Sequence, residues 1–324
     1  MKVAVTRVIP EAGLAMLRAA ADVALWDQSE PPSRADLVTL GRGCDGLLTL
    51  LTDPVDGDLL DELPTVRVVS NFAVGFDNVD VPACTARGVA VCTTPDVLTE
   101  TTADYAFALL MAVARRVVDG ARSAAAGAWK TWEPMGFLGP DVHGATVGII
   151  GMGRIGSAVA ARAHGFGMRI LYADSRPAPD AEASTGAERR DIDHVLRESD
   201  FVTLHVPLLA ETRGLIGTRE LKLMKPTATL INTSRGPVVQ TQALVQALQE
   251  GTIWGAGLDV TDPEPLPADS PLLSMARVVI TPHIASASEA TRARMAELAA
   301  ANVIAVLRGD RPPRCLNPEV LTRG

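Results

Sequence analysis

The chain has 324 residues and a formal net charge of −8, with 47% hydrophobic residues but only 4% aromatic ones. At roughly 150 residues per domain this length predicts two domains, each long enough to bury its own core. Acidic and basic residues are interspersed along the chain. The sequence therefore lacks the basic patch by which proteins bind nucleic acid or an anionic membrane, and we expect neither partner.

The cysteines and the most apolar segments point to the cellular compartment. Cys44, Cys84, Cys92 and Cys315 have no metal-type spacing and are too few for a disulfide framework. The first ten residues, MKVAVTRVIP, lack the basic stretch and long apolar run of a signal peptide. The most membrane-like segment, 105–114, has about ten residues where a span needs about 20. We therefore expect a cytoplasmic protein with reduced thiols, no membrane association and no metal site.

Short apolar runs alternate with helical patterns along the whole chain, which is typical of βαβ units and parallel sheets. The runs are apolar on both faces, as strands covered by helices on both sides should be. They fall into two sets, which predict two doubly wound α/β domains. The first set comprises 2–7, 22–27, 44–51, 66–72 and 89–95, and the second comprises 146–151, 169–174, 200–206, 228–234, 255–260 and 276–283.

Two long helical patterns, 101–120 and 287–307, connect the two sets, and Gly309 is a stop signal for the second. The second helix follows the final strand, so it can return the chain to the first domain. We therefore predict a discontinuous domain, 1–98 plus 287–324, and a continuous domain, 99–286. The segment 126–142 is unusually aromatic for this chain, which predicts a loop packed against another domain or subunit.

Residues 148–156, GIIGMGRIG, contain a GxGxxG motif that directly follows a predicted strand and opens a predicted helix. In a dinucleotide-binding turn, Gly151 permits the tight turn, Gly153 lets the backbone approach a pyrophosphate and Gly156 lets helix and strand pack closely. The amino end of the helix supplies N–H groups for the phosphates. The motif alone is also compatible with a plain glycine-rich turn, but the strand, the helix and an acid after the next strand all agree with the first interpretation.

That acid, Asp174, is placed to accept hydrogen bonds from the adenosine ribose hydroxyls. A carboxylate there would repel a 2′-phosphate, which favours NAD over NADP. The neighbouring Ser175 and Arg176 keep NADP possible, because an arginine at this point can bind the phosphate.

Three polar residues follow or close apolar strands: Arg235, Asp259 and His283. The ligand crevice of an open α/β sheet lies outside these strand ends. A guanidinium can hold a carboxylate with two hydrogen bonds, and a histidine can transfer a proton near neutral pH. Glu264 could orient the imidazole. Taken singly, Arg235 also fits a surface ion pair, His283 a capping residue and Glu264 an exposed turn carboxylate. Together, these residues suit the reduction of a 2-oxo acid. The other histidines, His143, His164, His194 and His205, are not expected to be catalytic.

On these residues the chain resembles the D-2-hydroxyacid dehydrogenases over essentially its whole length, and within them most closely the glyoxylate/hydroxypyruvate reductases. The resemblance implies a Rossmann cofactor domain, a flavodoxin-like substrate domain and a homodimer joined through the cofactor domains. Asp174 differs from the small residue followed by arginine that NADPH-preferring reductases usually carry. The matching stretches are 71–80 (NFAVGFDNVD), 148–156, 232–236 (NTSRG), 257–260 (GLDV), 263–265 (PEP) and 281–283 (TPH), and for the narrower group 129–134 (WKTWEP), 137–139 (FLG) and 258–267 (LDVTDPEPLP).

The resemblance also implies residue roles. Arg235 would bind the substrate carboxylate and carbonyl oxygen, His283 would protonate that oxygen as hydride arrives, and Glu264 would pair with His283. The backbone of Val74 and Gly75 would hold the carboxylate from the other domain, and Asp259 would orient the nicotinamide amide. The expected cofactor contacts are Gly151, Gly153, Arg154, Ile155, Gly156, Asp174, Ser175, Arg176, Val206, Pro207, Thr212, Thr233, Ser234, Asp259 and Ala285.

Three kinds of function stay open on the sequence. The first is NAD(P)H-dependent reduction of glyoxylate or hydroxypyruvate to glycolate or D-glycerate. The second keeps the same machinery for 3-phosphoglycerate, D-lactate, a bulkier 2-oxo acid or phosphite; the candidate substrate loops, 50–53 and 71–77, contain no Lys or Arg, which disfavours a phosphorylated substrate. The third is a non-catalytic NADH sensor that resembles the corepressors related to this family.

Overall fold

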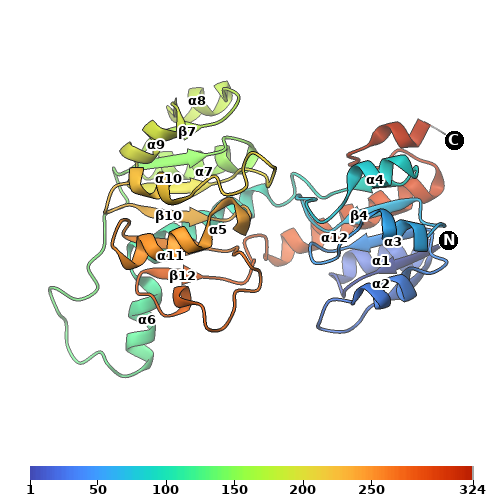
Figure 1. The fold of residues 1–324 in the computed structure, drawn as a ribbon, viewed down its shortest axis with the longest axis horizontal. Helices are drawn as coiled ribbons and strands as arrows, with labels where there is room; N and C mark the ends of the chain where they lie inside the picture. Colours follow the sequence, from blue (N-terminus) through green and yellow to red (C-terminus); the bar gives the residue numbers. More distant parts are fainter. Residues whose placement is uncertain (323–324) are drawn as a thin grey trace. The chain divides into compact units, whose positions relative to one another are not determined.

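The computed structural model describes residues 1–322, and the chain divides into two compact units (Figure 1). Unit 1 combines Met1–Leu98 with Ala287–Gly324, and unit 2 is Thr99–Ser286. Each unit is an α/β structure around one parallel sheet, which confirms the predicted fold class.

The unit 1 sheet has five parallel strands in the order β2-β1-β3-β4-β5, which is the flavodoxin-like order. One face packs against α1 and α12. On the other, apolar side chains of α2, α3 and α4 join those of the strands in one core cluster. The elements of this unit are β1 Lys2–Val5, α1 Glu11–Ala20, β2 Asp22–Leu25, α2 Arg34–Gly41, β3 Gly46–Thr49, α3 Gly57–Glu62, β4 Val68–Asn71, α4 Val81–Ala86, β5 Ala90–Cys92, α12 Glu289–Arg308 and η3 Pro318–Thr322.

Helix α12 confirms the long helix predicted over 287–307. It begins where the Ser288 hydroxyl accepts a hydrogen bond from the Thr291 amide, and it ends at Gly309, whose φ of 83° is a left-handed conformation that glycine adopts without steric cost. Met295, Ala299 and Val303 lie on its buried side. The apolar stripe thus explains why this helix, remote in sequence from the first strands, packs on their sheet.

The unit 2 sheet has seven parallel strands in the order β12-β11-β10-β9-β6-β7-β8. When β6 is taken as strand 1, the order from β8 to β12 is 3-2-1-4-5-6-7. This is the strand order of a Rossmann fold with a seventh strand, β12, added at the edge. The sequence did not predict β8, which has only two residues, too few for a periodic pattern. The strands are β6 Thr146–Ile150, β7 Arg169–Ala173, β8 Glu188–Arg189, β9 Phe201–Leu204, β10 Thr229–Asn232, β11 Gly255–Leu258 and β12 Val278–Ile280.

Helices cover both faces of this sheet. Residues of α5, α7 and α8 form one apolar core with the strands, and residues of α9, α10 and α11 form the other. The helices are α5 Thr99–Ala114, α6 Val117–Ala125, α7 Arg154–Gly165, α8 Pro179–Thr185, α9 Ile192–Glu198, α10 Thr218–Leu223 and α11 Thr241–Gln249, with 3₁₀ turns η1 Gly236–Val238 and η2 Pro271–Leu273.

The prediction of one helix over 101–120 is wrong, because α5 ends at Ala114 and α6 starts at Val117. Arg116 has a φ of 50°, which interrupts the helical hydrogen bonds between the two. Gly139 approaches the carbonyl of Ala114 so closely that a Cβ would lie 1.9 Å from its oxygen. The Arg116 guanidinium pairs with Asp119 at 3.0 Å and lies over the Phe137 ring. These long-range contacts fix the break, and no local pattern encodes them.

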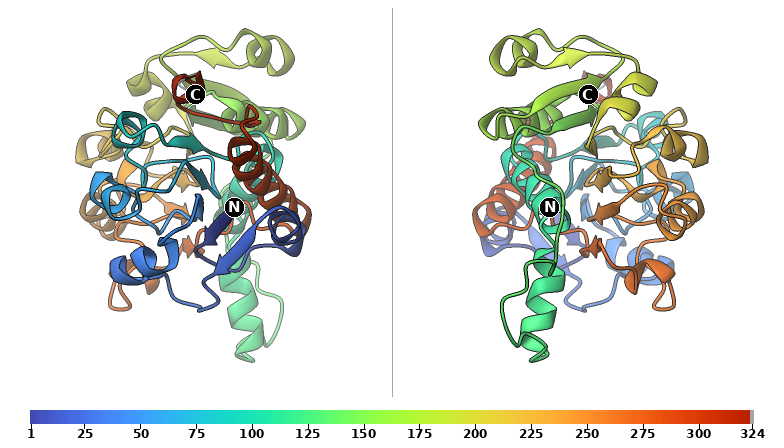
Figure 2. Two further views of the ribbon diagram at one scale, coloured as in Figure 1. Left: turned by 90° about the vertical axis from the view of Figure 1, so that its right-hand side faces the viewer. Right: turned by 90° about the vertical axis from the view of Figure 1, so that its left-hand side faces the viewer.

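Helix α6 and the segment after it extend away from the unit 2 sheet (Figures 1 and 2). None of the α6 residues is buried. The segment 126–142 is irregular, as predicted, and its large apolar side chains are strongly exposed: 74% for Trp129, 80% for Trp132 and 77% for Met135. Exposed apolar area of this kind is typical of a surface that another molecule covers.

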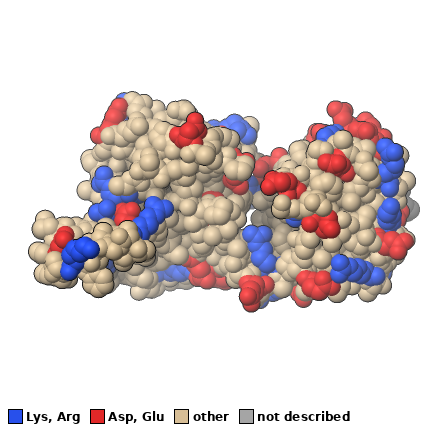
Figure 3. Space-filling model, turned by 90° about the horizontal axis from the view of Figure 1, so that it is seen from below, with Lys and Arg blue, Asp and Glu red and all other residues tan. Residues whose placement is uncertain are grey.

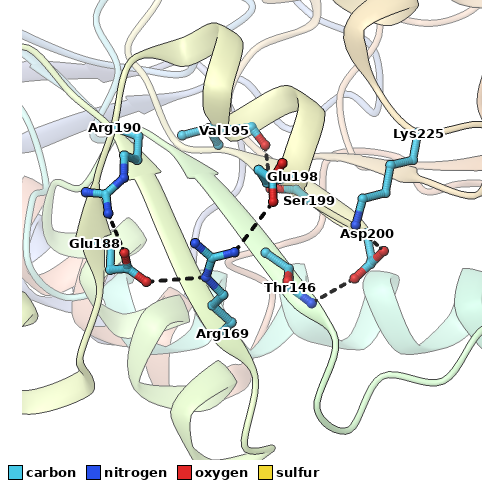
Figure 4. A network of polar contacts seen from close by, with 9 residues as sticks. All are labelled: Thr146, Arg169, Glu188, Arg190, Val195, Glu198, Ser199, Asp200 and Lys225. Atoms are coloured by element: carbon cyan, nitrogen blue, oxygen red, sulfur yellow. Dashed lines mark hydrogen bonds and ion pairs between the residues drawn. The ribbon is translucent and has the colours of Figure 1, made fainter.

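At the amino ends of the unit 2 strands, a charged network ties neighbouring strands together (Figure 4). Arg169 lies between Glu188 and Glu198, at 3.3 and 3.6 Å, and Lys225 pairs with Asp200 at 2.8 Å. Asp200 also accepts a hydrogen bond from the Thr146 amide at 2.9 Å. This network therefore accounts for charged residues at the edge of the sheet opposite to the carboxyl ends of the strands.

Basic and acidic side chains lie among one another on the face shown in Figure 3. Within residues 1–322, none of the helices combines the length and the apolar character needed to cross a membrane.

Candidate active site

The glycine motif forms the turn between β6 and α7. Gly151 has a φ of 95°, and a Cβ on it would lie 2.8 Å from the backbone of His205. A Cβ on Gly156 would lie 2.1 Å from the carbonyl oxygen of Gly151, so this glycine lets the helix pack against the turn. At Gly153 a Cβ would meet nothing within 4 Å. The turn thus leaves open backbone beside the amino end of α7, where a phosphate can bind.

The Asp174 carboxylate lies beside this turn, at the carboxyl end of β7. Its Oδ2 accepts a hydrogen bond from the Met152 amide at 2.7 Å, and its Oδ1 accepts one from the Arg176 amide at 3.0 Å. The Arg189 guanidinium donates to the backbone carbonyls of Asp174 and Ser175 at 2.9 and 3.2 Å. The carboxylate is therefore held next to the glycine turn, with Ser175 and Arg176 exposed beside it.

The loop after β10 carries Thr233, Ser234 and Arg235. Asn232 shapes it: the side-chain amide of Asn232 donates to the Arg235 carbonyl at 2.9 Å and its oxygen accepts from the Ser234 amide at 3.0 Å. Gly236 follows, and a Cβ there would overlap the Thr261 carbonyl oxygen at 1.8 Å. The Thr233 hydroxyl is buried and finds no hydrogen-bond partner within residues 1–322. Such an orphaned group beside the turn fits a bound cofactor that would supply its partner.

Together, these features meet what a nicotinamide dinucleotide requires: an open backbone cradle at a helix amino end, a fixed carboxylate and an unpaired hydroxyl.

Other expected contacts lie in loops at the same carboxyl edge of the sheet, after β9 and β12. Thr212 fixes the first of them, because its hydroxyl accepts from the Leu209 amide at 2.8 Å and donates to the Pro207 carbonyl at 2.6 Å. The remaining expected contacts are Arg154 and Ile155 in α7, Val206 after β9 and Ala285 after β12.

Asp259 is buried, with 1% of its surface exposed, and organises the loop 281–285. Its Oδ1 accepts from the Thr281 hydroxyl at 2.7 Å and the Ile284 amide at 2.8 Å, and its Oδ2 accepts from the Ala285 amide at 2.7 Å. Burial raises the pKa of Asp259, while these donors act in the opposite direction. The expected role of Asp259 was to orient the nicotinamide amide; in this structure its carboxylate holds the loop that carries His283.

Thr281 has a second partner, Tyr105 of α5. Burial raises the pKa of Tyr105, while the hydrogen bond with Thr281 acts in the opposite direction. The sequence analysis assigned no role to Tyr105 or Thr281. Two features of the sequence could have indicated such a role. Tyr105 is a polar residue within an apolar helix, and Thr281 is a polar residue two positions before His283.

His283 lies in this loop with a φ of 55°, a left-handed conformation that is uncommon for a residue with a side chain. Its amide donates to the Asp259 carbonyl at 2.9 Å, which helps to hold that conformation. Its Nδ1 lies 2.7 Å from Oε1 of Glu264. Since a carboxylate only accepts, Nδ1 carries a proton and Nε2 is left for a ligand.

The Glu264 carboxylate interacts with both other candidate catalytic residues, His283 and Arg235. Burial acts to raise the pKa of Glu264, but the hydrogen bond from His283, the charge of His283 and the charge of Arg235 outweigh it and lower the pKa. The Thr261 amide also donates to its Oε2 at 3.3 Å. An ionised Glu264 can thus stabilise a protonated imidazole in the same site as a guanidinium.

Among the remaining histidines, His205 directly follows β9 and its backbone lies against Gly151. Its Nε2 contacts the Thr203 hydroxyl at 2.9 Å, and burial lowers its pKa to about 3. His164 lies in α7 and contacts the Thr185 carbonyl, His194 lies in α9, and His143 lies in the turn before β6.

Val74 and Gly75 belong to unit 1, in the loop after β4. Asn71 holds the loop by donating to the Gly75 carbonyl at 2.9 Å and to Oδ1 of Asn78 at 3.0 Å. The Asn78 amide in turn donates to the carbonyls of Leu50 and Asp53. Within the described part of the chain the amides of Val74 and Gly75 donate no hydrogen bond, so they are available to an anionic ligand.

Comparisons with known proteins agree with this geometry. Residues 107–285 match the family described as D-isomer specific 2-hydroxyacid dehydrogenase, NAD binding domain. A glyoxylate reductase from Korarchaeum cryptofilum is 54% identical over 99% of this chain and 97% of its own length. A protein of known structure from Thermus thermophilus is 46% identical and superposes with a TM-score of 0.93, covering 98% of this chain and 100% of its own.

A further solved structure contains ligands of the expected classes. It is an NADPH-dependent glyoxylate/hydroxypyruvate reductase from Sinorhizobium meliloti in complex with NADP and malonate. It is 33% identical to this chain, with a TM-score of 0.87 and coverage of 97% of this chain and 96% of its own. The family expected from the sequence is thus confirmed, and the chain belongs to the D-isomer-specific 2-hydroxyacid dehydrogenases.

Proposed function

We propose that this protein reduces a small 2-oxo acid, glyoxylate or hydroxypyruvate, to glycolate or D-glycerate with a reduced nicotinamide dinucleotide. The observation that carries the proposal is the hydrogen bond between His283 and Glu264, 2.7 Å long, at the carboxyl edge of the unit 2 sheet. The positive charge of Arg235 acts on the same carboxylate. Relatives named glyoxylate reductase, about half identical over nearly the whole chain, support the substrate class.

In the proposed reaction, His283 is the proton donor. Its Nδ1–H is directed at Glu264, so the protonated imidazole offers Nε2–H to the carbonyl oxygen of the substrate. Glu264 stabilises the charged imidazole before the proton leaves. Arg235 holds the substrate carboxylate with its planar guanidinium. The cofactor, when bound, supplies the hydride.

We propose NADH as the preferred cofactor. Asp174 would accept hydrogen bonds from the ribose hydroxyls, and its charge would repel a 2′-phosphate. The exposed Arg176 beside it makes NADPH the second possibility. The pyrophosphate would lie over Gly153 at the start of α7, and the Thr233 hydroxyl would gain its missing partner from the cofactor.

We assign the cofactor to unit 2. We also propose that the amides of Val74 and Gly75, which donate no hydrogen bond within the described residues, bind the carboxylate of the substrate. We also propose a homodimer, because the exposed Trp129, Trp132 and Met135 form an apolar surface that a second subunit would cover. A cytoplasmic location is consistent with the four free thiols.

The test is the loss of reduced-nicotinamide absorbance with glyoxylate and with hydroxypyruvate, each with NADH and NADPH. The expected result is turnover of at least one of these acids, with higher kcat/KM for NADH. If neither acid turns over, the oxidative reaction is assayed with D-lactate, 3-phosphoglycerate and phosphite. Folded protein that binds NADH but turns over none of these substrates would contradict the enzyme assignment and favour a sensor of NADH.

A further inference from the structure

Two thiols of unit 1 touch where the carboxyl-terminal segment meets the edge of its sheet. Cys92 is the last residue of β5 and is fully buried, whereas Cys315 is partly exposed. A hydrogen bond joins the two sulfur atoms. The other cysteines have different surroundings: Cys44 donates to the Leu40 carbonyl at 3.5 Å, and Cys84 is buried in α4. Cys92 and Cys315 therefore form a pair that the sequence spacing did not indicate.

The backbone around this pair holds the two residues close to one another. The Leu316 amide donates to the Val91 carbonyl at 2.8 Å. The Asn317 side chain accepts from the Val91 amide at 2.8 Å and donates to the Val89 carbonyl at 2.9 Å. These bonds hold residues 316 and 317 against β5. Cys315 directly precedes Leu316 and Cys92 directly follows Val91, so the backbone bond between Leu316 and Val91 brings the two cysteines close together.

This placement suits a disulfide. A disulfide requires Cα atoms about 4.4–6.8 Å apart with the side chains facing one another, and the contact between the two sulfur atoms meets the second condition. The segment is also anchored just before the pair, where the Arg314 amide donates to Oδ1 of Asn302 at 2.9 Å and the guanidinium pairs with Asp96 at 2.7 Å. A bond between the sulfurs would thus join two backbones that non-covalent contacts already hold together.

We propose that Cys92 and Cys315 are a site of reversible covalent modification, at which a peroxide oxidises the two thiols to a disulfide. In the first step the Cys315 sulfur attacks a peroxide oxygen, and the O–O bond breaks to give a sulfenic acid and water. In the second step the Cys92 sulfur attacks the Cys315 sulfur, and the S–OH bond breaks to release a second water. The two thiols lose two electrons and two protons, and the peroxide is reduced to two molecules of water.

The two cysteines differ in the way that these steps require. The hydrogen bond from Cys92 lowers the pKa of Cys315 to about 7, and Cys315 is the more exposed of the two. The attacking thiolate is therefore available near neutral pH. The same hydrogen bond and burial raise the pKa of Cys92, which protects it from direct attack and suits it to the resolving step.

The disulfide would attach the carboxyl-terminal segment to the edge strand of the unit 1 sheet. It would restrict the unfolded chain more than the folded one, because hydrogen bonds already hold the two segments together in the folded chain. The expected consequence is a higher temperature of thermal unfolding after oxidation, reversed by a dithiol reductant. This consequence does not depend on the proposed catalytic activity.

The experiment treats the full chain with hydrogen peroxide and compares it with the same protein after dithiothreitol. Intact mass should fall by two hydrogen atoms, a non-reducing digest should yield one cross-linked peptide containing Cys92 and Cys315, and the unfolding temperature should rise by several degrees. Cys315→Ser should lose both the cross-link and the rise. Cys84→Ser, which changes an unpaired buried thiol of the same unit, should keep both; if it does not fold, Cys44→Ser takes its place.

Three results would overturn the proposal. One is the addition of oxygen atoms at Cys315 without a cross-link. Another is a cross-link that involves Cys44 or Cys84. The third is a rise in unfolding temperature that persists in Cys315→Ser. A protein that forms the cross-link but reduces no 2-oxo acid would retain this inference and reject only the proposed function.

Discussion

Replacement of Thr281 by valine tests whether Asp259 and Thr281 hold the catalytic loop in position. Valine keeps the shape of threonine but removes the hydroxyl that donates to Asp259 at 2.7 Å and that also interacts with Tyr105. Asp259 keeps its two amide donors from the loop, Ile284 and Ala285. The variant therefore removes one hydrogen bond from a buried carboxylate without unfolding the loop around it.

The size of the effect follows from the charge and the burial of the acceptor. A hydrogen bond to a charged group contributes about 1.5–3 kcal/mol, and Asp259 has no solvent to replace the lost donor. Part of this loss will reach His283, because its φ of 55° is maintained by the same loop. The upper limit applies when the whole hydrogen-bond energy serves to hold the imidazole in its reactive position. In that case kcat falls by roughly 10- to 150-fold, since about 1.4 kcal/mol corresponds to a factor of ten.

The assay is steady-state reduction of the best 2-oxo acid by NADH, with kcat and KM measured separately. Thr281→Val should lower kcat while the Kd for NADH stays within a few-fold of wild type. Thr281→Ser, which keeps the hydroxyl, is the matched control and should recover most of the kcat. Tyr105→Phe should have a smaller effect, because Thr281 still donates to Asp259. Wild-type kcat in Thr281→Val, or equal impairment of the serine variant, would refute the role of the hydroxyl.

Four further predictions concern the site and its stability. His283→Ala should lower kcat by at least a hundredfold with NADH binding, followed by fluorescence titration, nearly unchanged; lost NADH affinity would mean a different role. Arg235→Lys should lower kcat/KM by more than tenfold, because lysine cannot make the two-pronged contact; normal efficiency would exclude it as the carboxylate anchor. Asp174→Gly should raise the NADPH-to-NADH ratio of kcat/KM by at least tenfold, and an unchanged ratio would reject the ribose contact. Burial lowers the pKa of His205 from 6.5 to about 3, so between these values the unfolded chain binds a proton that the folded chain does not. The free energy of unfolding should then fall by up to about 1.4 kcal/mol per pH unit on acidification through this range, and His205→Gln should flatten that slope in urea titrations.

Much of the fold could be predicted because the determinants are local. Strands such as 146–151 are apolar on both faces, which requires helices on either side and therefore a parallel sheet. The glycine turn is equally local: Gly151 needs a positive φ, and Gly156 needs the absence of a side chain where its Cβ would meet the Gly151 carbonyl. Arg235, Asp259 and His283 could be predicted to lie at one edge of the sheet, because each lies at the carboxyl end of a strand and parallel strands bring these ends to the same edge.

Features that rest on contacts between distant segments could not be predicted in this way. The helix predicted over 101–120 breaks at Arg116. There Gly139 of a later loop packs against the Ala114 carbonyl, and Phe137 packs against Arg116. Helical periodicity continues through such a position, since it reports only which residues are apolar. Strand β8, with two residues, likewise owes its place to pairing with β7.

The sequence by itself determined two sheets, a dinucleotide turn and a set of acid, base and guanidinium residues, because periodicity, glycine spacing and strand-end position are properties of short segments. Only the tertiary structure decided that Asp259 binds the loop of His283, that Tyr105 reaches Thr281, and that Cys92 meets Cys315. Each of these contacts joins segments that are separated in the chain. Their proximity is set by how helices and strands pack, and a local sequence pattern carries no record of it.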